Sequence, residues 1–277
     1  MKALQKTAIS AAAVALLTGL SSISAFAEEA AAEAPEVSPI TANVTVTNDY
    51  RYRGITQSNY QPAVQGGFDY AHESGFYIGN WNSSINWIAN ANPTVTAPIE
   101  MDFYGGFKKE LIGEGFASDF GVLQYYYPAK GSYTANLNPN TTEIYAAQNF
   151  TFGPITGFAK VSYALTTLFG TTNSAGSTYP DLTVNYDTGF WGLTANGHIG
   201  YQYVAGQPNT SNMGQSQKNI SYTDWKLGMT KDFGGGLSAQ ASYISTNANP
   251  TFYSTTTNGS TTWAGRGGAN ISLTKTF

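Results

Sequence analysis

The sequence predicts an all-β fold: a closed antiparallel up-and-down transmembrane β-barrel of about twelve strands, after a cleaved signal peptide. Apolar and polar residues alternate over many segments of strand length, which indicates strands with two chemically different faces. The connections between these segments alternate between short and long, and the number of segments is even, as in bacterial outer-membrane barrels. Aromatic residues gather at the segment ends, where the two interfaces of a bilayer favour them.

The composition narrows the classes of function before any motif is considered. The chain has 277 residues, a formal net charge of -4, 11% charged residues and no cysteine. With so few Lys and Arg residues it has no basic stripe for a nucleic acid, which excludes nucleic-acid binding. Without cysteine it has no disulfide, no thiol nucleophile and no Cys-based metal site.

The N-terminus has the three parts of a secretory signal. Lys2 and Lys6 precede an apolar run, and the small-x-small sequence Ala25-Phe26-Ala27 follows. We therefore interpret 1–27 as a signal peptide, 28–39 as an acidic Ala/Pro-rich periplasmic tail and 40–277 as the barrel. The apolar run is shorter than the roughly 18 residues of a membrane-spanning helix. The chain is therefore expected to cross the outer membrane of a Gram-negative cell with strands.

Residues 40–54 (ITANVTVTNDYRYRG) give the most regular alternation and predict the first strand. The even positions are mostly apolar and end in Tyr50 and Tyr52, while the odd positions are polar and end in Arg51 and Arg53. The segment is long enough to cross a bilayer while tilted. We expect its even face to contact lipid and both arginines to lie in the lumen near the outer mouth.

The other strands follow in order, separated by Gly-, Pro- and Asn-rich turns and loops. Residues 116–127 are apolar at both parities, so the faces of that strand cannot be assigned. The expected strands are 64–70, 77–87, 99–108, 116–127, 142–150, 155–165, 181–186, 191–203, 224–230, 237–243 and 267–277.

Two aromatic girdles and the aromatic last residue favour a membrane barrel. A secreted β-sandwich or a soluble barrel would require neither the girdles nor a terminal aromatic residue. Phe277 ends an alternating strand and resembles the terminal assembly signal of outer-membrane proteins, so the barrel-assembly machinery is an expected partner, beside outer-membrane lipid. The girdle near the long loops is Tyr50, Tyr52, Trp87, Tyr125, Tyr163, Tyr201, Tyr203 and Tyr243, and the one near the short turns is Phe68, Tyr70, Phe107, Phe150, Tyr186, Trp191 and Phe233.

Three neighbouring stretches carry a family resemblance: 48–58 (NDYRYRGITQS), 62–70 (PAVQGGFDY) and 75–81 (GFYIGNW). They resemble the opening of the TorF-type porin family, formerly an uncharacterised family of proteobacterial secreted proteins. The resemblance implies an outer-membrane barrel with a porin role. It implies no catalytic residue and no particular solute.

The polar faces supply candidate pore-lining residues rather than a catalytic set. We expect Arg51, Arg53 and Arg266 to form a basic cluster that faces acidic groups across the pore, because rings of charge set ion selectivity. The alternative is that these charges pair with one another and hold the wall. The candidates are Asp49, Arg51, Arg53, Asp69, Glu100, Asp102, Lys108, Glu143, Lys160, His198, Asp224, Lys226 and Arg266.

The favoured function is therefore passive diffusion of small hydrophilic solutes or ions through a polar lumen. Two other classes remain open: an outer-membrane barrel enzyme of the lipase or protease type, and a plugged structural or adhesive barrel. His72 lies beside Glu73 and Ser74 in a turn, where neighbouring side chains are expected to point apart, and His198 is expected to be a lumen wall residue. No cofactor, metal site or catalytic residue is predicted.

Overall fold

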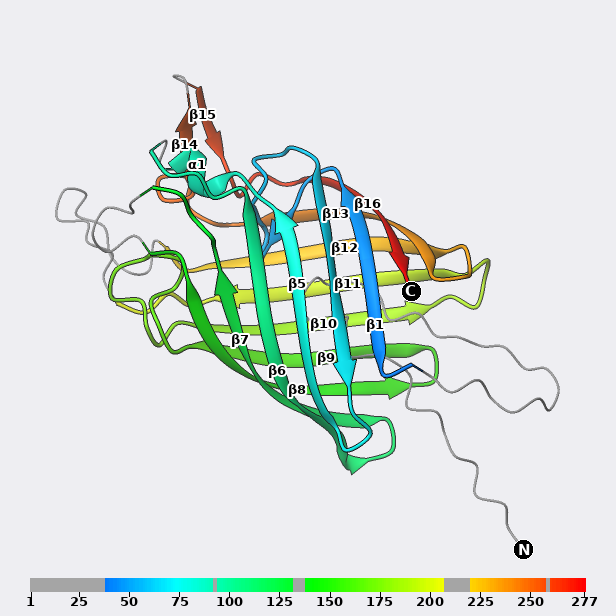
Figure 1. Cartoon of the computed structure of the whole chain (residues 1–277). Coiled ribbons are helices and arrows are strands. Elements are labelled where there is room, and N and C mark those ends of the chain that lie inside the picture. Colours follow the sequence, from blue (N-terminus) through cyan, green and yellow to red (C-terminus); the bar gives the residue numbers. More distant parts are fainter. Residues whose placement is uncertain (1–37, 92–93, 132–137, 207–219, 258–259) are drawn as a thin grey trace, which may run out of the picture.

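The computed structural model describes residues 38–91, 94–131, 138–206, 220–257 and 260–277, so the expected signal peptide and nearly all of the tail lie outside the described residues. In the described part, twelve antiparallel strands form a closed barrel (Figure 1). The first strand closes it, because Val46 pairs with Val64 on one side and with Leu273 on the other. The prediction of a closed twelve-stranded barrel is confirmed. Its strands are β1 (Ile40–Thr47), β4 (Ala63–Ala71), β5 (Phe76–Ser84), β6 (Ile99–Gly113), β7 (Phe116–Tyr126), β8 (Thr141–Phe152), β9 (Ile155–Ala164), β10 (Thr178–Asp187), β11 (Leu193–Gln202), β12 (Tyr222–Asp232), β13 (Leu237–Thr246) and β16 (Gly268–Thr276).

The barrel wall is apolar outside and polar inside. In β1 and β16 the exposed residues Val46 and Leu273 alternate with the buried residues Thr45 and Thr274, whose hydroxyl groups lie 2.8 Å apart. A continuous apolar outer band suits acyl chains, while the polar inner face suits water. The outward apolar set includes Val44, Val46, Val64, Ile78, Phe103, Val122, Ile144, Val161, Leu182, Val184, Ile199, Leu227, Met229, Ile271 and Leu273.

In two strands, the alternation of apolar and polar residues did not identify which face points outward. In β7, Phe120 and Val122 are exposed outward, while Asp119 and Leu123 are buried inward, which assigns the strand whose faces could not be predicted. In β5 the residues that alternate as an apolar set, among them Tyr77 and Trp81, are buried inside the barrel. The outward face of β5 begins with Phe76 and Ile78. Large aromatic side chains therefore occupy part of the lumen.

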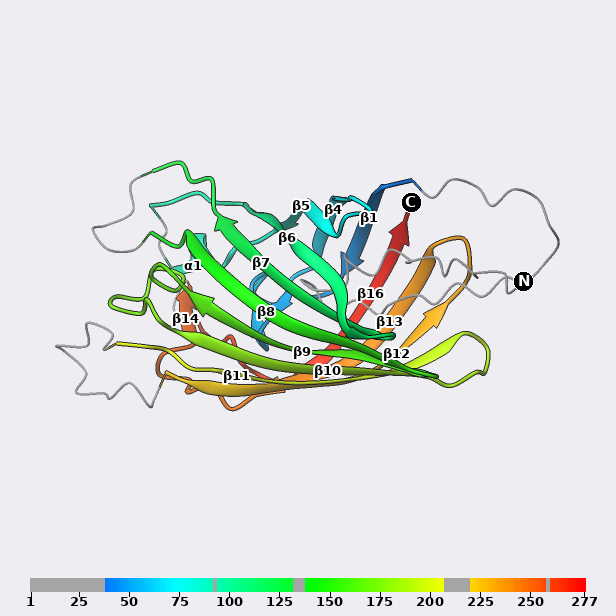
Figure 2. The same ribbon diagram turned by 90° about the horizontal axis from the view of Figure 1, so that it is seen from below.

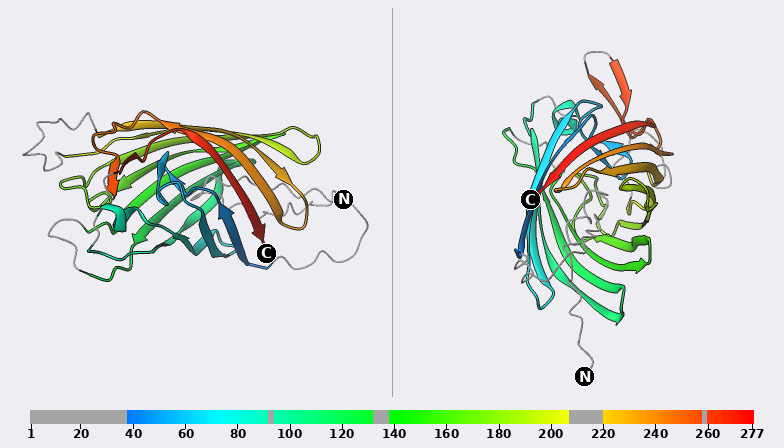
Figure 3. Two further views of the ribbon diagram at one scale, coloured as in Figure 1. Left: turned by 90° about the horizontal axis from the view of Figure 1, so that it is seen from above. Right: turned by 90° about the vertical axis from the view of Figure 1, so that its right-hand side faces the viewer.

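Short and long connections lie at opposite ends of the barrel (Figure 2). The C-terminus lies at the end with the short turns, and α1 (Trp87–Ala91) lies at the other end (Figure 1). A small hairpin, β14 (Ser254–Thr257) and β15 (Ser260–Trp263), projects away from the wall (Figure 3). Among the described residues, no helix is long and apolar enough to cross a membrane.

The prediction for the first strand, which extended it to Gly54, is wrong at its end. The observed strand β1 ends at Thr47. The chain then leaves the wall and forms a hairpin of β2 (Arg51–Tyr52) and β3 (Ile55–Thr56) before it returns as β4. The expected outer girdle is wrong at four positions. Tyr50, Tyr52 and Tyr125 pack inside the barrel, with Tyr50 and Tyr125 buried, and Trp87 lies on α1 and packs against the same cluster. Tyr163, Tyr201, Tyr203 and Tyr243 of that girdle are exposed.

Candidate functional site

The segment between β1 and β4 folds into the barrel, and we call residues 49–58 of it the lumen hairpin. Arg53 and Gly54 join β2 to β3, and both have a positive φ, 46° and 76°. Two consecutive residues of this kind form the tight turn whose twist matches a hairpin, and glycine favours this conformation. Arg53 adopts it at a conformational cost, which its side-chain contacts offset.

The Arg53 side chain joins the tip of the lumen hairpin to two sides of the barrel. Its guanidinium donates to Glu143 Oε2 on β8 at 2.7 Å and to Gln202 Oε1 on β11 at 2.6 Å. It also lies 4.2 Å from the ring centroid of Tyr179 on β10. Burial alone would lower the pKa of Arg53, but Glu143 and neighbouring tyrosines raise it above its ordinary value. The guanidinium therefore stays charged and paired.

Other residues of the lumen hairpin contact the wall on further sides. The Tyr50 hydroxyl donates to Glu100 Oε1 on β6 at 2.6 Å. Burial raises the pKa of Tyr50, and the carboxylates of Glu100 and Asp102 raise it further, so the phenol keeps its proton. The Tyr52 and Tyr125 hydroxyls lie 2.5 Å apart. The hairpin thus reaches β6, β7, β8, β10 and β11 at once, and it crosses the lumen.

The base of the lumen hairpin is held by its own carboxylate. Asp49 is buried, pairs with Arg51 and accepts hydrogen bonds from the Thr56 and Ser58 hydroxyls at 2.5 and 3.1 Å. Arg51 also donates to the backbone oxygens of Gly54 and Arg266 at 3.0 and 2.9 Å. These bonds fix the inward fold of the segment.

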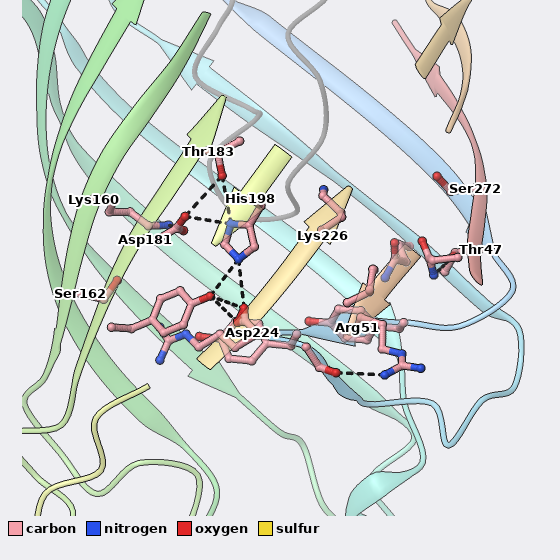
Figure 4. A pocket seen from close by; sticks show the side chains of 18 of the residues that line it. Thr47, Arg51, Lys160, Ser162, Asp181, Thr183, His198, Asp224, Lys226 and Ser272 are labelled. Atoms are coloured by element: carbon pink, nitrogen blue, oxygen red, sulfur yellow. Dashed lines mark hydrogen bonds and ion pairs between the residues drawn. The ribbon is translucent and has the colours of Figure 1, made fainter. Parts of the chain in front are cut away.

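Beside the hairpin, strands β9 to β12 present a charged patch to a cavity of about 150 Å³. His198 lies at its centre, with Asp181 3.0 Å from Nδ1 and Asp224 3.0 Å from Nε2. Figure 4 shows Lys160 and Lys226 on either side of this histidine. Another part of the cavity wall is small and polar, with Thr45, Thr47, Ser162, Thr183, Asn270 and Ser272 among its residues, and Tyr77, Tyr104 and Tyr145 line the cavity from the opposite side. We call the side formed by β9–β13, β16 and β1 the open half of the lumen.

The opposite side, formed by β4–β8, carries large inward side chains that border the same cavity, and we call it the packed half. Tyr77, Tyr104 and Tyr145 point inward there, and each lies against a glycine of a neighbouring strand, where a Cβ atom would overlap it. Their hydroxyl groups are bonded inside the barrel: Tyr77 to Asp119 at 2.7 Å and to Tyr145, and Tyr104 to Asp69 at 2.6 Å. The glycines that receive Tyr104, Tyr77 and Tyr145 are Gly79, Gly106 and Gly121.

The structure separates the expected basic cluster. Arg51 and Arg266 lie on the ring of Tyr60, at 4.8 and 4.6 Å, whereas Arg53 pairs with Glu143 on the far wall. Arg266 is exposed, and Lys108 on β6 lies opposite Asp119 on β7. Of the other candidates, Asp49, Lys160, His198, Asp224 and Lys226 line the cavity, and Asp69, Glu100, Asp102 and Glu143 are buried elsewhere inside the barrel.

Three residues of the site were not among the candidates. Asp181 faces Lys160 directly across the β9–β10 pair and bonds His198. In the sequence, only its place on the polar face of a predicted strand indicated that it points inward. Tyr179 donates to both oxygens of Asp224 at 2.8 Å. Asp119 binds the Tyr77 hydroxyl. Each depends on cross-strand register, which alternation alone does not give.

The two histidines have different surroundings. The expectation that the side chains of the His72 turn point apart is wrong, because His72 Nδ1 lies 2.7 Å from Ser74 Oγ. The same nitrogen also accepts the Ser74 amide at 3.2 Å, and the pair is exposed. His198 contacts carboxylates, a phenol and Thr183. Among the described residues, no group of three or more His, Cys, Asp or Glu side chains is arranged to hold a metal ion.

Solved structures of porins share this fold. The NanC porin superimposes with a TM-score of 0.53 at 9% sequence identity, over 86% of this chain and 98% of that one. The KdgM porin gives a TM-score of 0.49 at 5% identity, over 86% and 97% of the two chains. No curated protein matches the sequence. A family model described as "Bacterial protein of unknown function (Gcw_chp)" matches residues 29–277. The chain therefore belongs to the Gcw_chp family and has a porin-like β-barrel fold.

Proposed function

We propose that the chain is an outer-membrane channel through which small hydrophilic solutes or ions diffuse passively, and that the lumen hairpin narrows it. The observation that carries the proposal is a cavity of about 150 Å³ in the lumen, to which the open half contributes charged and small polar side chains, inside a barrel with an apolar outer wall. Such a wall replaces the hydration of a polar solute, whereas a filled core would exclude it.

The likeness to porin folds and the resemblance of residues 48–81 to the TorF-type family support this proposal. It includes removal of residues 1–27 as a signal peptide and a periplasmic tail at 28–39. It also includes recognition of Phe277, at the end of β16, by the barrel-assembly machinery. Outer-membrane lipid then surrounds the apolar band.

A plugged barrel is the second candidate, and the contacts of the lumen hairpin favour it. Arg53, Tyr50 and Tyr52 bond residues on four strands around the lumen, which leaves only the open half for passage. An enzyme has less support, since His72 and Ser74 form an exposed pair within one turn and the described partners of His198 include no serine.

Single-channel currents of the purified mature chain in planar bilayers test the proposal. Thr47 and Ala63 are paired neighbours at the ends of β1 and β4, so a short Gly-Ser linker can replace residues 49–61 without breaking the barrel. We expect a small conductance in the unaltered chain and a severalfold larger one without the hairpin, because the constriction is gone. The same replacement at 255–262, in the projecting β14–β15 hairpin, is the control and should leave the conductance unchanged.

Two outcomes decide between the candidates. A chain that conducts only after the lumen hairpin is removed is a plugged barrel. A chain that conducts in neither form, while circular dichroism and heat-modifiable mobility show a folded barrel, contradicts the channel. Swelling of liposomes in sugars and amino acids then ranks the neutral solutes that pass.

A further inference from the structure

The geometry of the open half points to a solute site: we propose that Lys160, His198 and Lys226, with Asp181 and Asp224, bind a small monocarboxylate. We call these five residues the lumen anion site. The inference rests on the proposed function and deepens it, because it names the class of solute that the channel favours.

The register of the strands builds this site. Lys160 lies directly opposite Asp181 across β9 and β10, and His198 lies directly opposite Lys226 across β11 and β12. Asp181 and His198 occupy adjacent levels of the inner wall and bond one another. Four neighbouring strands therefore bring three basic and two acidic side chains onto one continuous patch, and all five line the same cavity (Figure 4).

The contacts of His198 require it to carry a positive charge. Ionised carboxylates accept hydrogen bonds and donate none, and a neutral imidazole has only one N–H group. Asp181 and Asp224 each approach a different ring nitrogen at 3.0 Å. Only the doubly protonated ring donates to both, so His198 counts as a cation with Lys160 and Lys226.

Three cations against two carboxylates leave one excess positive charge in a buried patch. Lys226 is 8% exposed and Asp224 is 1% exposed, so water screens this charge poorly. The nearest other charges cancel in pairs: Arg51 with Asp49, Arg53 with Glu143, and Lys108 opposite Asp119. The remaining acids, Asp69, Glu100 and Asp102, belong to the packed half. An anion from solution therefore completes the charge balance of the open half.

The size and the charge of the site select its ligand. One excess charge matches a monoanion, whereas a phosphate with nearly two charges would also face Asp181 and Asp224. A cavity of about 150 Å³ is smaller than the roughly 300 Å³ at which pockets for drug-sized ligands begin. The hydroxyl groups of Thr183 and Ser162 and the amide of Asn270 line it and suit a hydroxylated chain. A small hydroxycarboxylate such as lactate fits both conditions.

Calorimetric titration of the folded full-length mature barrel in detergent with sodium lactate, sodium phosphate or uncharged glycerol tests the site directly. We expect lactate to bind more tightly than phosphate, and glycerol not to bind. Lys226→Gln or Lys160→Gln should weaken lactate binding at least about tenfold, the loss for one charge-assisted hydrogen bond. Asp181→Asn should tighten it, because it adds to the excess charge. Lys109→Gln removes the same charge from the exposed surface and is the control.

Reversal potentials across a KCl gradient give a second readout. The unaltered channel should prefer chloride, the lysine variants should shift towards potassium, and Asp181→Asn should shift further towards chloride. A role of these side chains only in holding the wall would not produce shifts of opposite sign. The inference is overturned if the channel conducts with unchanged ion preference in every variant, an outcome that leaves the proposed function standing. It is also overturned if lactate does not bind or phosphate binds more tightly. If the protein does not conduct at all, the proposed function fails, and the titration alone decides the site.

Discussion

The two halves of the lumen are built on the same alternation of residues and border the same cavity, yet one half presents bulky tyrosines to it and the other presents mostly charged and small polar side chains. In the packed half the inward positions of β5, β6 and β8 carry Tyr77, Tyr104 and Tyr145. In the open half the inward positions of β1 and β16 carry residues such as Thr45 and Ser272. The difference teaches that polarity assigns the inner face of a strand, while side-chain volume decides how much of the lumen that face occupies.

Glycines make the filling of the packed half possible. A tyrosine that points into a narrow barrel needs space on the neighbouring strand, and Gly79, Gly106 and Gly121 supply it. The open half has one such pair, Tyr179 against Gly200, and there the hydroxyl bonds Asp224 beside the cavity. Arg53 joins the two halves, because it bonds β8 on one side and β11 on the other.

The largest effect is expected where the two halves are joined. Arg53→Met leaves the Glu143 carboxylate, whose side chain is 2% exposed, with the Tyr125 hydroxyl at 3.3 Å as a remaining donor. An uncompensated buried charge costs about 3 to 5 kcal/mol, so the free energy of unfolding should fall by that amount. Urea unfolding in lipid vesicles, followed by tryptophan fluorescence, measures it.

The double variant Arg53→Met with Glu143→Gln should recover part of the loss, since it removes both charges. Arg266→Met is the control, because that guanidinium is exposed and its removal should change the free energy of unfolding by less than about 0.5 kcal/mol. Equal losses at Arg53 and Arg266 would show that the hairpin does not couple the halves.

Much of the fold could be predicted from residues alone, but the lumen hairpin could not. The alternation of β1 continues unbroken to Arg53, so periodicity gives no sign that the wall ends at Thr47. Tyr50 and Tyr52 suit either a lipid interface or a polar interior, because each ring has an apolar body and a polar tip. The turn could have been predicted from Gly54, which follows Arg53 and lies between the short segments Arg51–Tyr52 and Ile55–Thr56.

The sequence predicted which charged side chains of the site point inward, but not which of them pair with one another. Parity placed Lys160, His198 and Lys226 on the polar face, and all three line the cavity. Which acid meets which base depends on the register between strands, and this register is set by turn geometry and packing that a single sequence does not show. Asp181 was missed as a candidate for this reason.

A moderate effect is expected from adding volume to each half in turn. An alanine at Gly121 would place its Cβ on the Tyr145 hydroxyl and break its bond to Tyr77, so the free energy of unfolding should fall by about 1 to 3 kcal/mol. Ser272→Gln adds more atoms but directs them into the cavity, so it should cost less than about 1 kcal/mol. The same urea unfolding compares them. If the larger addition in the open half costs more, the division into a packed and an open half is wrong.

The smallest effect concerns the carboxylates that the packed half buries. Asp102 is 2% exposed, its Oδ1 has no hydrogen-bond partner, and Glu100 lies two residues away on the same face. The substitution Asp102→Asn removes the repulsion from Glu100 and the cost of burying a charge, so the free energy of unfolding should rise by about 1 kcal/mol.

Asp49→Asn is the matched contrast, because that carboxylate pairs with Arg51 and accepts two hydroxyl bonds. Its loss should lower the free energy of unfolding by about 1.5 to 3 kcal/mol. Changes of the same sign in both variants would mean that a cation or an ordered water satisfies Asp102, and that the packed half is wetter than its tyrosines suggest.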